Sequence, residues 1–233
     1  MKLARPFADR RAAGCALAKV LTDRNRAAPV ILALPRGGVP VAAEIASALK
    51  APLDIVLVRK IGVPFQRELA VAAVVDGAQP EVVVNEDVTQ LASVTRDYID
   101  AGVMQELQEI ERRRQVYLQG RVRVPLEGRT VVLVDDGIAT GATVRAAVKA
   151  LKRKALKALI LAVPVAPLQT IEALKNEVDE VVCLRTPEPF VAIGVHYADF
   201  NQVSDDEVVR LLAEQADERA QPHISEVTKT GMS

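Results

Sequence analysis

The stretch VVLVDDGIATGAT, from Val131 to Thr143, decides the fold of this chain. An apolar run rich in β-branched residues ends in two adjacent aspartates, and a loop of small residues follows. Continuous apolar runs are typical of strands that are buried on both faces of a parallel sheet. A helix is predicted directly afterwards, over 142–152. The stretch therefore predicts a strand, a loop and a helix, which is the repeating unit of an α/β domain.

The same alternation extends along the chain in both directions. Apolar runs predict strands at 30–34, 54–58, 130–134, 158–163 and 180–184, and helical patterns predict helices at 9–24, 41–50, 142–152 and 168–175. A strand pair at 70–77 and 81–85 and a long helix at 95–118, capped by Thr95, interrupt the alternation. Ser204 and Glu207 form a capping box that predicts a last helix. The predicted fold is α/β: a mainly parallel five-stranded sheet with helices on both faces, plus a small excursion.

Composition and charge narrow the classes of function. Lys and Arg together number 30, as do Asp and Glu, so the formal net charge is zero. A neutral chain with 3% aromatic residues lacks the basic and aromatic surfaces of nucleic-acid-binding modules. No run approaches the ~20 apolar residues of a membrane span, and the N-terminus has no apolar leader. We expect a cytoplasmic protein without nucleic-acid or membrane partners, with one domain over 1–217, a core at about 30–185 and a polar, flexible tail at 218–233.

Three predicted strands end in residues that are unusual for a plain turn. PRGG follows the first strand, RKIG follows the second, and DDGIATGAT follows the strand at 130–134. Ligands of open α/β sheets bind outside the carboxyl ends of the strands. We therefore expect one site where these loops meet.

The DDGIATGAT loop combines two opposite chemical preferences. Backbone N–H groups at the start of the following helix favour an anion, and Thr140 and Thr143 add hydroxyl donors. Ionised Asp135 and Asp136 only accept hydrogen bonds, so they would repel a phosphate but suit a pair of hydroxyls. A ribose 5-phosphate, with a diol at one end and a phosphate at the other, satisfies both halves. The alternative is a helix-capping turn whose carboxylates face water.

These residues resemble the signature that binds 5-phosphoribosyl 1-diphosphate (PRPP) in the type I phosphoribosyltransferases. VVLVDDGIATGAT matches its strand, acid pair and small-residue loop, and ALPRGG at 33–38 resembles its diphosphate loop. RKIGVPFQRE at 59–68 falls where the family has its flexible catalytic loop. The resemblance covers about 30–185 and is strongest to predicted phosphoribosyltransferases of unassigned acceptor. It implies transfer of the 5-phosphoribosyl group from PRPP to a nitrogen acceptor, a nucleobase or related compound, with release of diphosphate.

The resemblance also implies roles for individual residues. Asp135 and Asp136 would bind the ribose 2- and 3-hydroxyls. The 5-phosphate would lie in the loop formed by Ala139, Thr140, Gly141, Ala142 and Thr143. The diphosphate would meet Arg36, Gly37 and Gly38, in a loop where the family often has a non-proline cis peptide.

Catalysis in the family depends on stabilising charge on the leaving diphosphate. The implied catalytic cations are Arg36, Arg59 and Lys60, the last two on a loop that closes over the ligand. Mg²⁺ is the implied cofactor, held mainly through PRPP and water and without direct protein ligands. Alternatively, Arg36 belongs to a surface turn, and Arg59 and Lys60 to an ordinary charged strand end. Family members are commonly dimers, so a homodimer is also implied.

Ala139 departs from part of the family. Relatives that use 6-oxopurines usually carry an acid at this position, which exchanges a proton with the base, and Ala139 cannot do so. A base would come from Glu68 or Asp76, or the acceptor would need none. The aromatic segment around His196 either forms a hood over the acceptor or packs at the domain edge. Two functions stay open: an enzyme, favoured by the presence of both PRGG and RKIG, or a non-catalytic PRPP- or nucleotide-binding regulator on the same fold.

Overall fold

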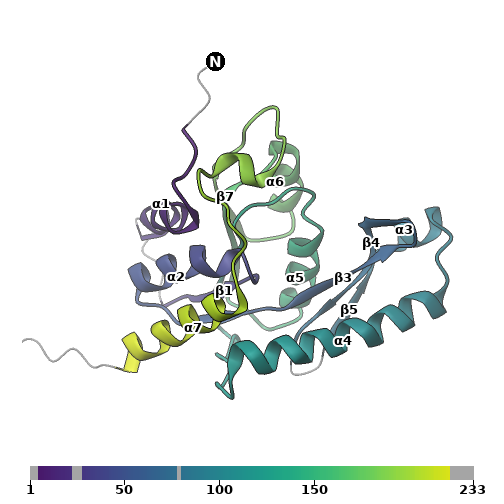
Figure 1. Cartoon of the computed structure of the whole chain (residues 1–233), viewed down its shortest axis with the longest axis horizontal. Helices are drawn as coiled ribbons and strands as arrows, with labels where there is room; N and C mark the ends of the chain where they lie inside the picture. The colour runs from purple at the N-terminus through teal and green to yellow at the C-terminus, as the bar shows by residue number, and fades with distance from the viewer. Residues whose placement is uncertain (1–4, 23–27, 78–79, 221–233) are drawn as a thin grey trace, which may run out of the picture.

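The main sheet of the computed structural model confirms the predicted parallel core (Figure 1). The structure describes residues 5–22, 28–77 and 80–220. Five strands lie in the order β2-β1-β6-β7-β8, and every neighbouring pair is parallel. Their bounds are β1 (Val30–Ala33), β2 (Leu53–Ile55), β6 (Thr130–Val134), β7 (Ala158–Val165) and β8 (Glu180–Arg185). The strand of the opening stretch, β6, therefore lies at the centre of the sheet, beside β1.

Helices cover both faces of this sheet, as predicted. One face packs against α1 (Arg10–Thr22), α2 (Gly38–Leu49) and α7 (Asp205–Ala220), and the other against α5 (Ala142–Lys152) and α6 (Leu168–Lys175). In β1, Ile31 belongs to the core cluster that contains α2, whereas Leu32 belongs to the cluster that contains α5. Successive strand residues point to opposite faces, so a strand covered on both sides must be apolar at every position.

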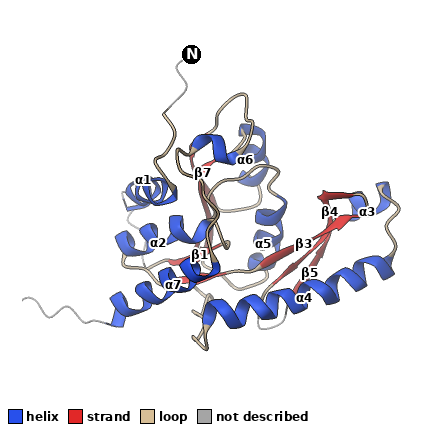
Figure 2. Ribbon diagram, in the orientation of Figure 1, coloured by secondary structure: helices blue, strands red, loops and turns tan. Residues whose placement is uncertain are grey.

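A second, antiparallel sheet projects from the main one (Figure 1, Figure 2). It contains β3 (Val58–Val63), β4 (Gln66–Val75) and β5 (Glu81–Val84), with β4 in the middle. The short helix α3 (Glu86–Leu91) follows, and the long helix α4 (Arg96–Leu118) runs along the projection. The predicted excursion is therefore a three-stranded sheet with its own long helix.

The stretch 59–68 corrects the prediction of an irregular, mobile loop. Its first half lies in β3 and its second half in β4, and the two strands form a hairpin whose turn contains Pro64 and Phe65. Gly62 lies at a shift in strand register, which accommodates it inside the ladder. Ile61 and Val63 are buried in the same core cluster as residues of α4. The segment is a regular strand because it is buried against this helix, and the local sequence does not predict that burial.

Other element bounds differ from the prediction in physically clear ways. The predicted strand at 54–58 is divided, because β2 ends at Ile55 and the chain then enters the second sheet at Val58. Helix α2 begins at Gly38 rather than at 41, since Pro40 falls in the first helical turn, where its missing N–H costs nothing. Helix α7 continues to Ala220, into the predicted tail, and the rest of that tail lies outside the described residues.

The predicted helix caps are confirmed. Thr95 Oγ1 accepts a hydrogen bond from the Tyr98 N–H at 3.3 Å, at the start of α4. Ser204 Oγ accepts one from the Glu207 N–H at 3.1 Å, at the start of α7. Each cap satisfies one of the N–H groups that a helix leaves free in its first turn.

Across the described part of the chain, no helix combines the length and the apolar character that crossing a membrane requires.

Candidate functional site

The PRGG loop and the acid pair meet at the carboxyl edge of the main sheet. Ala33 at the end of β1 pairs with Val134 at the end of β6, and the Leu34 N–H donates to the Val134 carbonyl at 2.9 Å. The loops therefore leave the sheet side by side. A Cβ at Gly37 would lie 2.1 Å from Asp136 Oδ2, and one at Gly38 would lie 2.7 Å from the Val134 carbonyl oxygen. Only glycine permits this approach.

The Asp136 carboxylate is buried and held from several sides. Arg10 Nε donates to Asp136 Oδ2 at 2.7 Å, and both side chains are nearly covered, at 11% and 12% exposure. The Tyr197 hydroxyl donates to the Asp136 backbone carbonyl at 2.5 Å. The Asp136 N–H donates to Asp135 Oδ1 at 2.9 Å, which orients the neighbouring carboxylate. The acid pair is therefore a fixed structure and not a freely solvated turn.

Burial raises the pKa of both acids. The pKa of Asp135 is raised well above its ordinary range by loss of hydration and by the neighbouring charge of Asp136. Burial also raises the pKa of Asp136, and the hydrogen bond and charge of Arg10 oppose this effect. Two adjacent carboxylates with one balancing cation favour a partner that donates hydrogen bonds or carries positive charge.

The small-residue loop connects this acid pair to α5. Ile138 is buried and its N–H donates to the Val165 carbonyl at 2.9 Å, whereas Ala139 and Thr140 are exposed. Gly141 precedes α5 with φ of 79°, a conformation that favours glycine, and no side chain caps the helix. The first turn of α5 thus presents backbone N–H groups beside a loop without bulky side chains.

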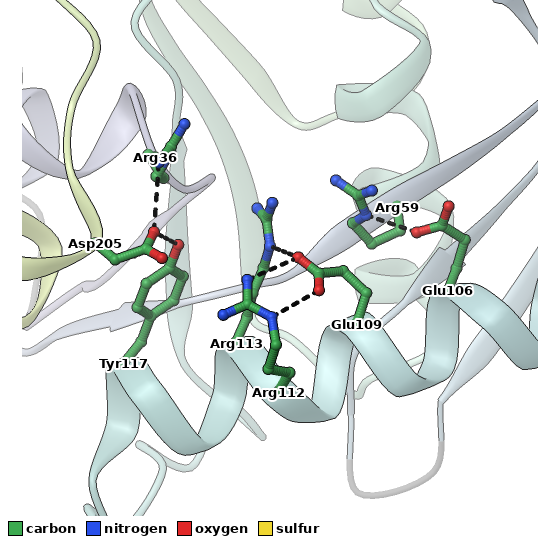
Figure 3. A network of polar contacts seen from close by, with 8 residues as sticks. All are labelled: Arg36, Arg59, Glu106, Glu109, Arg112, Arg113, Tyr117 and Asp205. Atoms are coloured by element: carbon green, nitrogen blue, oxygen red, sulfur yellow. Dashed lines mark hydrogen bonds and ion pairs between the residues drawn. The ribbon is translucent and has the colours of Figure 1, made fainter.

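Arg36 contacts the first residue of α7. The peptide bond between Pro35 and Arg36 is cis, as the family resemblance implied. Arg36 Nη1 lies 3.5 Å from Asp205 Oδ1, at the start of α7, and the Tyr117 hydroxyl donates to the same oxygen at 2.6 Å (Figure 3). Burial and this hydrogen bond raise the pKa of Tyr117 to about 12. Asp205 therefore anchors the PRGG arginine to α4 and α7.

Arg59 and Lys60 are not assembled around the PRGG loop. Arg59 Nε donates to Glu106 Oε2 on α4 at 2.7 Å. Figure 3 shows Arg59 over Glu106 and Arg36 over Tyr117, and roughly 16 Å of helix separates those two α4 residues. Consecutive strand residues point to opposite faces, so Lys60 lies on the face of β3 away from Arg59. The structure brings one of the three predicted catalytic cations, Arg36, to the loops.

Asp76 and the aromatic segment around Tyr197 are engaged in contacts of their own. Asp76 is buried at the end of β4 and pairs with Arg123, and the side chain of Glu68 lies outside the described residues. The Tyr197 ring packs between Phe7 and Phe200, with centroid distances of 5.6 and 4.9 Å. These rings pack against one another, and the Tyr197 hydroxyl supports the acid pair through the Asp136 carbonyl.

Arg10 is the site residue that sequence reasoning missed. It lies 126 positions from Asp136, in the first turn of a helix that otherwise shows only an apolar stripe and an exposed charged face. No motif marks it, because its partner is defined by the packing of α1 against the carboxyl edge of the sheet.

Among the described residues, no group of three or more His, Cys, Asp or Glu side chains is arranged to hold a metal ion.

Comparisons with known proteins agree on one family. The family model for the phosphoribosyl transferase domain matches residues 9–199. Two curated proteins of Mycobacterium tuberculosis, "Putative phosphoribosyl transferase MT0597" (strain CDC 1551 / Oshkosh) and "Putative phosphoribosyl transferase Rv0571c" (strain H37Rv), are each 47% identical over 206 residues. The match covers 88% of this chain and 46% of theirs, so the chain spans about half their length. The crystal structure of TT1426 from Thermus thermophilus superposes with a TM-score of 0.79 at 40% identity, covering 91% of this chain and 99% of that one.

Proposed function

Because the chain belongs to the phosphoribosyl transferase domain family, we propose that it transfers the 5-phosphoribosyl group from PRPP to a nitrogen acceptor and releases diphosphate. The contact between the PRGG loop and the acid pair carries this proposal. Gly37 and Gly38 bring the backbone of one loop against the other, so a single ligand can bridge both. A sugar that bears a diol and a neighbouring diphosphate has the matching arrangement of donors and charge.

Each part of PRPP has a matching group in the site. The ribose hydroxyls would donate to Asp135 and Asp136, whose carboxylates accept hydrogen bonds. The 5-phosphate would lie at the start of α5, where the loop has small residues and no side-chain cap. The diphosphate would lie against Gly37 and Gly38, with Arg36 as the nearest cation of the loop. With the three parts of PRPP bound in these positions, the bond between the ribose and the diphosphate would lie above the junction of the two loops.

The proposed reaction breaks the bond between C1 of the ribose and the diphosphate and forms a bond from C1 to the acceptor nitrogen. The proton that this nitrogen carries passes to water or to the released diphosphate. Negative charge grows on the diphosphate as it leaves, so cations fixed in advance lower the barrier. Arg36 lies in the PRGG loop itself, and its Nη1 is 3.5 Å from Asp205 Oδ1. It would act on the diphosphate after turning from this partly exposed contact toward the ligand.

Mg²⁺ fits the proposal as a companion of the substrate. The ion prefers oxygen ligands, keeps several waters and is commonly bound through substrate phosphates and one or two carboxylates. The described residues contain no cluster of three such ligands, and Asp135 and Asp136 are assigned to the ribose hydroxyls, so we propose that the ion is held through the diphosphate and water. When bound, Mg²⁺ would neutralise charge on the diphosphate. The ion would be held through PRPP and water, without direct protein ligands.

The acceptor site lacks a proton-handling acid in the phosphate loop, where Ala139 is exposed. Asp76, a candidate base, is engaged with Arg123 in a separate buried pair. We therefore propose an acceptor whose attacking nitrogen needs no general base from this loop.

The second candidate function is a non-catalytic PRPP- or nucleotide-binding regulator. The engagement of Arg59 with Glu106, and the opposite orientation of Lys60, favour it, because the cationic loop of an enzyme is not assembled in this structure. The enzyme would require the β3–β4 hairpin to move relative to α4 before Arg59 reaches the diphosphate.

Titration with PRPP and Mg²⁺, followed by a diphosphate-release assay over a panel of nucleobases and related nitrogen compounds, tests both functions. Binding with release supports the enzyme, and binding without release for every acceptor supports the regulator. No binding at millimolar PRPP rejects both. Asp135→Asn should abolish binding, whereas Asp87→Asn, an exposed aspartate on α3, should leave it unchanged. The proposal includes a cytoplasmic homodimer, for which sedimentation gives the oligomeric state and fractionation the location.

A further inference from the structure

The segment that leads into α1 and the segment that precedes α7 form a clasp behind the acid pair. We use this term for residues 7–10 together with residues 196–201. The Phe7 N–H donates to the His196 carbonyl at 2.8 Å, and the Ala198 N–H donates to the Phe7 carbonyl at 2.8 Å. A third bond joins the Asp199 N–H to the Ala8 carbonyl at 2.9 Å. These bonds position Arg10, the first residue of α1, beside Asp136.

The Arg10 guanidinium has three defined contacts. Its Nε donates to Asp136 Oδ2 at 2.7 Å, and its Nη1 donates to the Asn201 carbonyl at 2.7 Å. The guanidinium carbon lies 3.9 Å from the centroid of the Phe200 ring. Phe200 stacks on Tyr197, whose hydroxyl donates back to the Asp136 carbonyl. This closed circuit fixes the direction of the guanidinium, which is planar and permanently charged.

The same circuit limits what Asp136 can do. One carboxylate oxygen, Oδ2, accepts from Arg10 and faces the Gly37 backbone so closely that a Cβ would lie 2.1 Å away. The carboxylate is therefore held between α1 and the PRGG loop and cannot turn freely. A ligand would find it in one orientation only.

We propose that Arg10 is a positioning residue for the acid pair: it holds the Asp136 carboxylate in one orientation, so that this carboxylate accepts a hydrogen bond from a ribose hydroxyl. This inference rests on the proposed function, because it assigns Arg10 to the binding of the PRPP diol. Arg10 itself is covered and acts through Asp136, without touching the sugar.

The charges around Asp136 explain why a cation is needed. Burial raises the pKa of Asp136, and Arg10 lowers it. Asp135, on the same loop, is a second carboxyl group whose pKa the charge of Asp136 helps to raise. Tyr197 faces Asp136 as a neutral hydroxyl whose pKa lies far above its ordinary value. Arg36, on the facing loop, is directed to Asp205. Without Arg10, the buried Asp136 and the neighbouring, partly buried Asp135 would lack their balancing charge, and protonation of the pair would set in at higher pH.

The test compares Arg10→Gln with Arg11→Gln. Arg11 is the next residue of the same helix and pairs with Glu44 at 2.7 Å on the exposed side, which makes it a matched control. The affinity for PRPP with Mg²⁺ is measured from pH 5 to pH 8.5. We expect Arg10→Gln to bind PRPP more weakly than the wild type. As pH falls, its affinity should decrease from a higher pH onward, and at a given low pH the loss should be about tenfold for each unit by which the pKa of the acid pair has increased. Arg11→Gln should retain the wild-type profile.

Arg10→Lys separates charge from general support of the fold. It keeps a cation but loses the planar fork and its stacking on Phe200. We expect a few-fold loss of affinity with nearly the wild-type pH profile. A profile identical to that of Arg10→Gln would overturn the role of the charge, and so would a wild-type profile in Arg10→Gln.

A measurement without ligand distinguishes this inference from the proposed function. Carbon-13 NMR follows the titration of aspartate carboxyls, with Asp136→Asn assigning the signal. We expect the Asp136 carboxyl to titrate at higher pH in Arg10→Gln than in the wild type. An unchanged titration overturns the inference whether or not PRPP binds. A shifted titration in a protein that binds no PRPP upholds the effect of Arg10 on Asp136 and rejects the proposed function.

Discussion

Gly37→Ala should destabilise the protein through one identifiable side chain. The new Cβ would lie 2.1 Å from Asp136 Oδ2 and 2.5 Å from Asp136 Cγ. Ordinary contact begins at about 3.5 Å, so either the loop or the carboxylate must move by more than about 1 Å. The carboxylate has little freedom to do so, because Arg10 holds it at 2.7 Å in a nearly covered position. Over-packing of this kind typically costs about 1–3 kcal/mol.

A double-mutant cycle isolates the cause of that cost. In an Asp136→Ala background the clash disappears, so most of the penalty of Gly37→Ala should disappear with it. Asp136→Ala is costly by itself, since it leaves Arg10 buried without its partner, but this cost is present in both arms of the cycle and cancels. The free energy of unfolding of each variant is measured by urea denaturation.

Gly38→Ala provides the matched control. Its Cβ would lie 2.7 Å from the Val134 carbonyl oxygen, a backbone atom that Asp136→Ala does not remove. We therefore expect coupling of about 1 kcal/mol or more between Gly37→Ala and Asp136→Ala, and additive effects for Gly38→Ala. Additive free energies for the Gly37 pair would refute the contact on which the junction of the two loops is based.

Three further predictions concern the ionisable groups. Asp135→Asn should raise the melting temperature by a few degrees at pH 7, with no gain below about pH 4. The pKa of Asp135 is raised in the folded state, so the wild type loses stability as pH rises from the pKa of the unfolded state toward that of the folded state. Equal melting curves at pH 7 would contradict this. Tyr117→Phe should cost about 1.5–3 kcal/mol by urea denaturation, because it removes a hydrogen bond to the Asp205 carboxylate, whereas Tyr98→Phe, at a partly exposed tyrosine, should cost less. Two arginines lower the pKa of Glu109 to about 2, so its ionised carboxylate stabilises the fold. At neutral pH the free energy of unfolding of the wild type, measured by urea denaturation, should exceed that of Glu109→Gln by less than about 1 kcal/mol, and this difference should be lost as pH falls from about 4.5 toward 2.

The parallel core could be predicted because each of its signals is local. Runs such as 130–134 and 158–163 consist almost entirely of apolar residues, and a strand covered on both faces requires that pattern whatever its neighbours are. Helix starts at Thr95 and Ser204 were predictable for the same reason, since a cap involves residues three positions apart.

The second sheet could not be predicted in detail. RKIGVPFQRE contains a glycine, a proline and several charges, which locally indicate an irregular loop. Its conformation depends on burial of Ile61 and Val63 against α4, a helix that begins more than thirty residues later. The place where the chain leaves the main sheet, between Ile55 and Val58, likewise follows from pairing with β4.

The sequence by itself determined the chemistry that the site presents: two adjacent carboxylates, a loop of small residues at a helix start, and the PRGG turn. These properties follow from residue type and short-range order. Only the tertiary structure decided which residues share the site. Packing of α1 against the carboxyl edge of the sheet brings Arg10 to Asp136 across 126 positions. Because β3 belongs to the second sheet, Arg59 lies against α4 and donates to Glu106. Contacts at such separations arise from the burial of distant apolar surfaces against one another, and no local pattern encodes them.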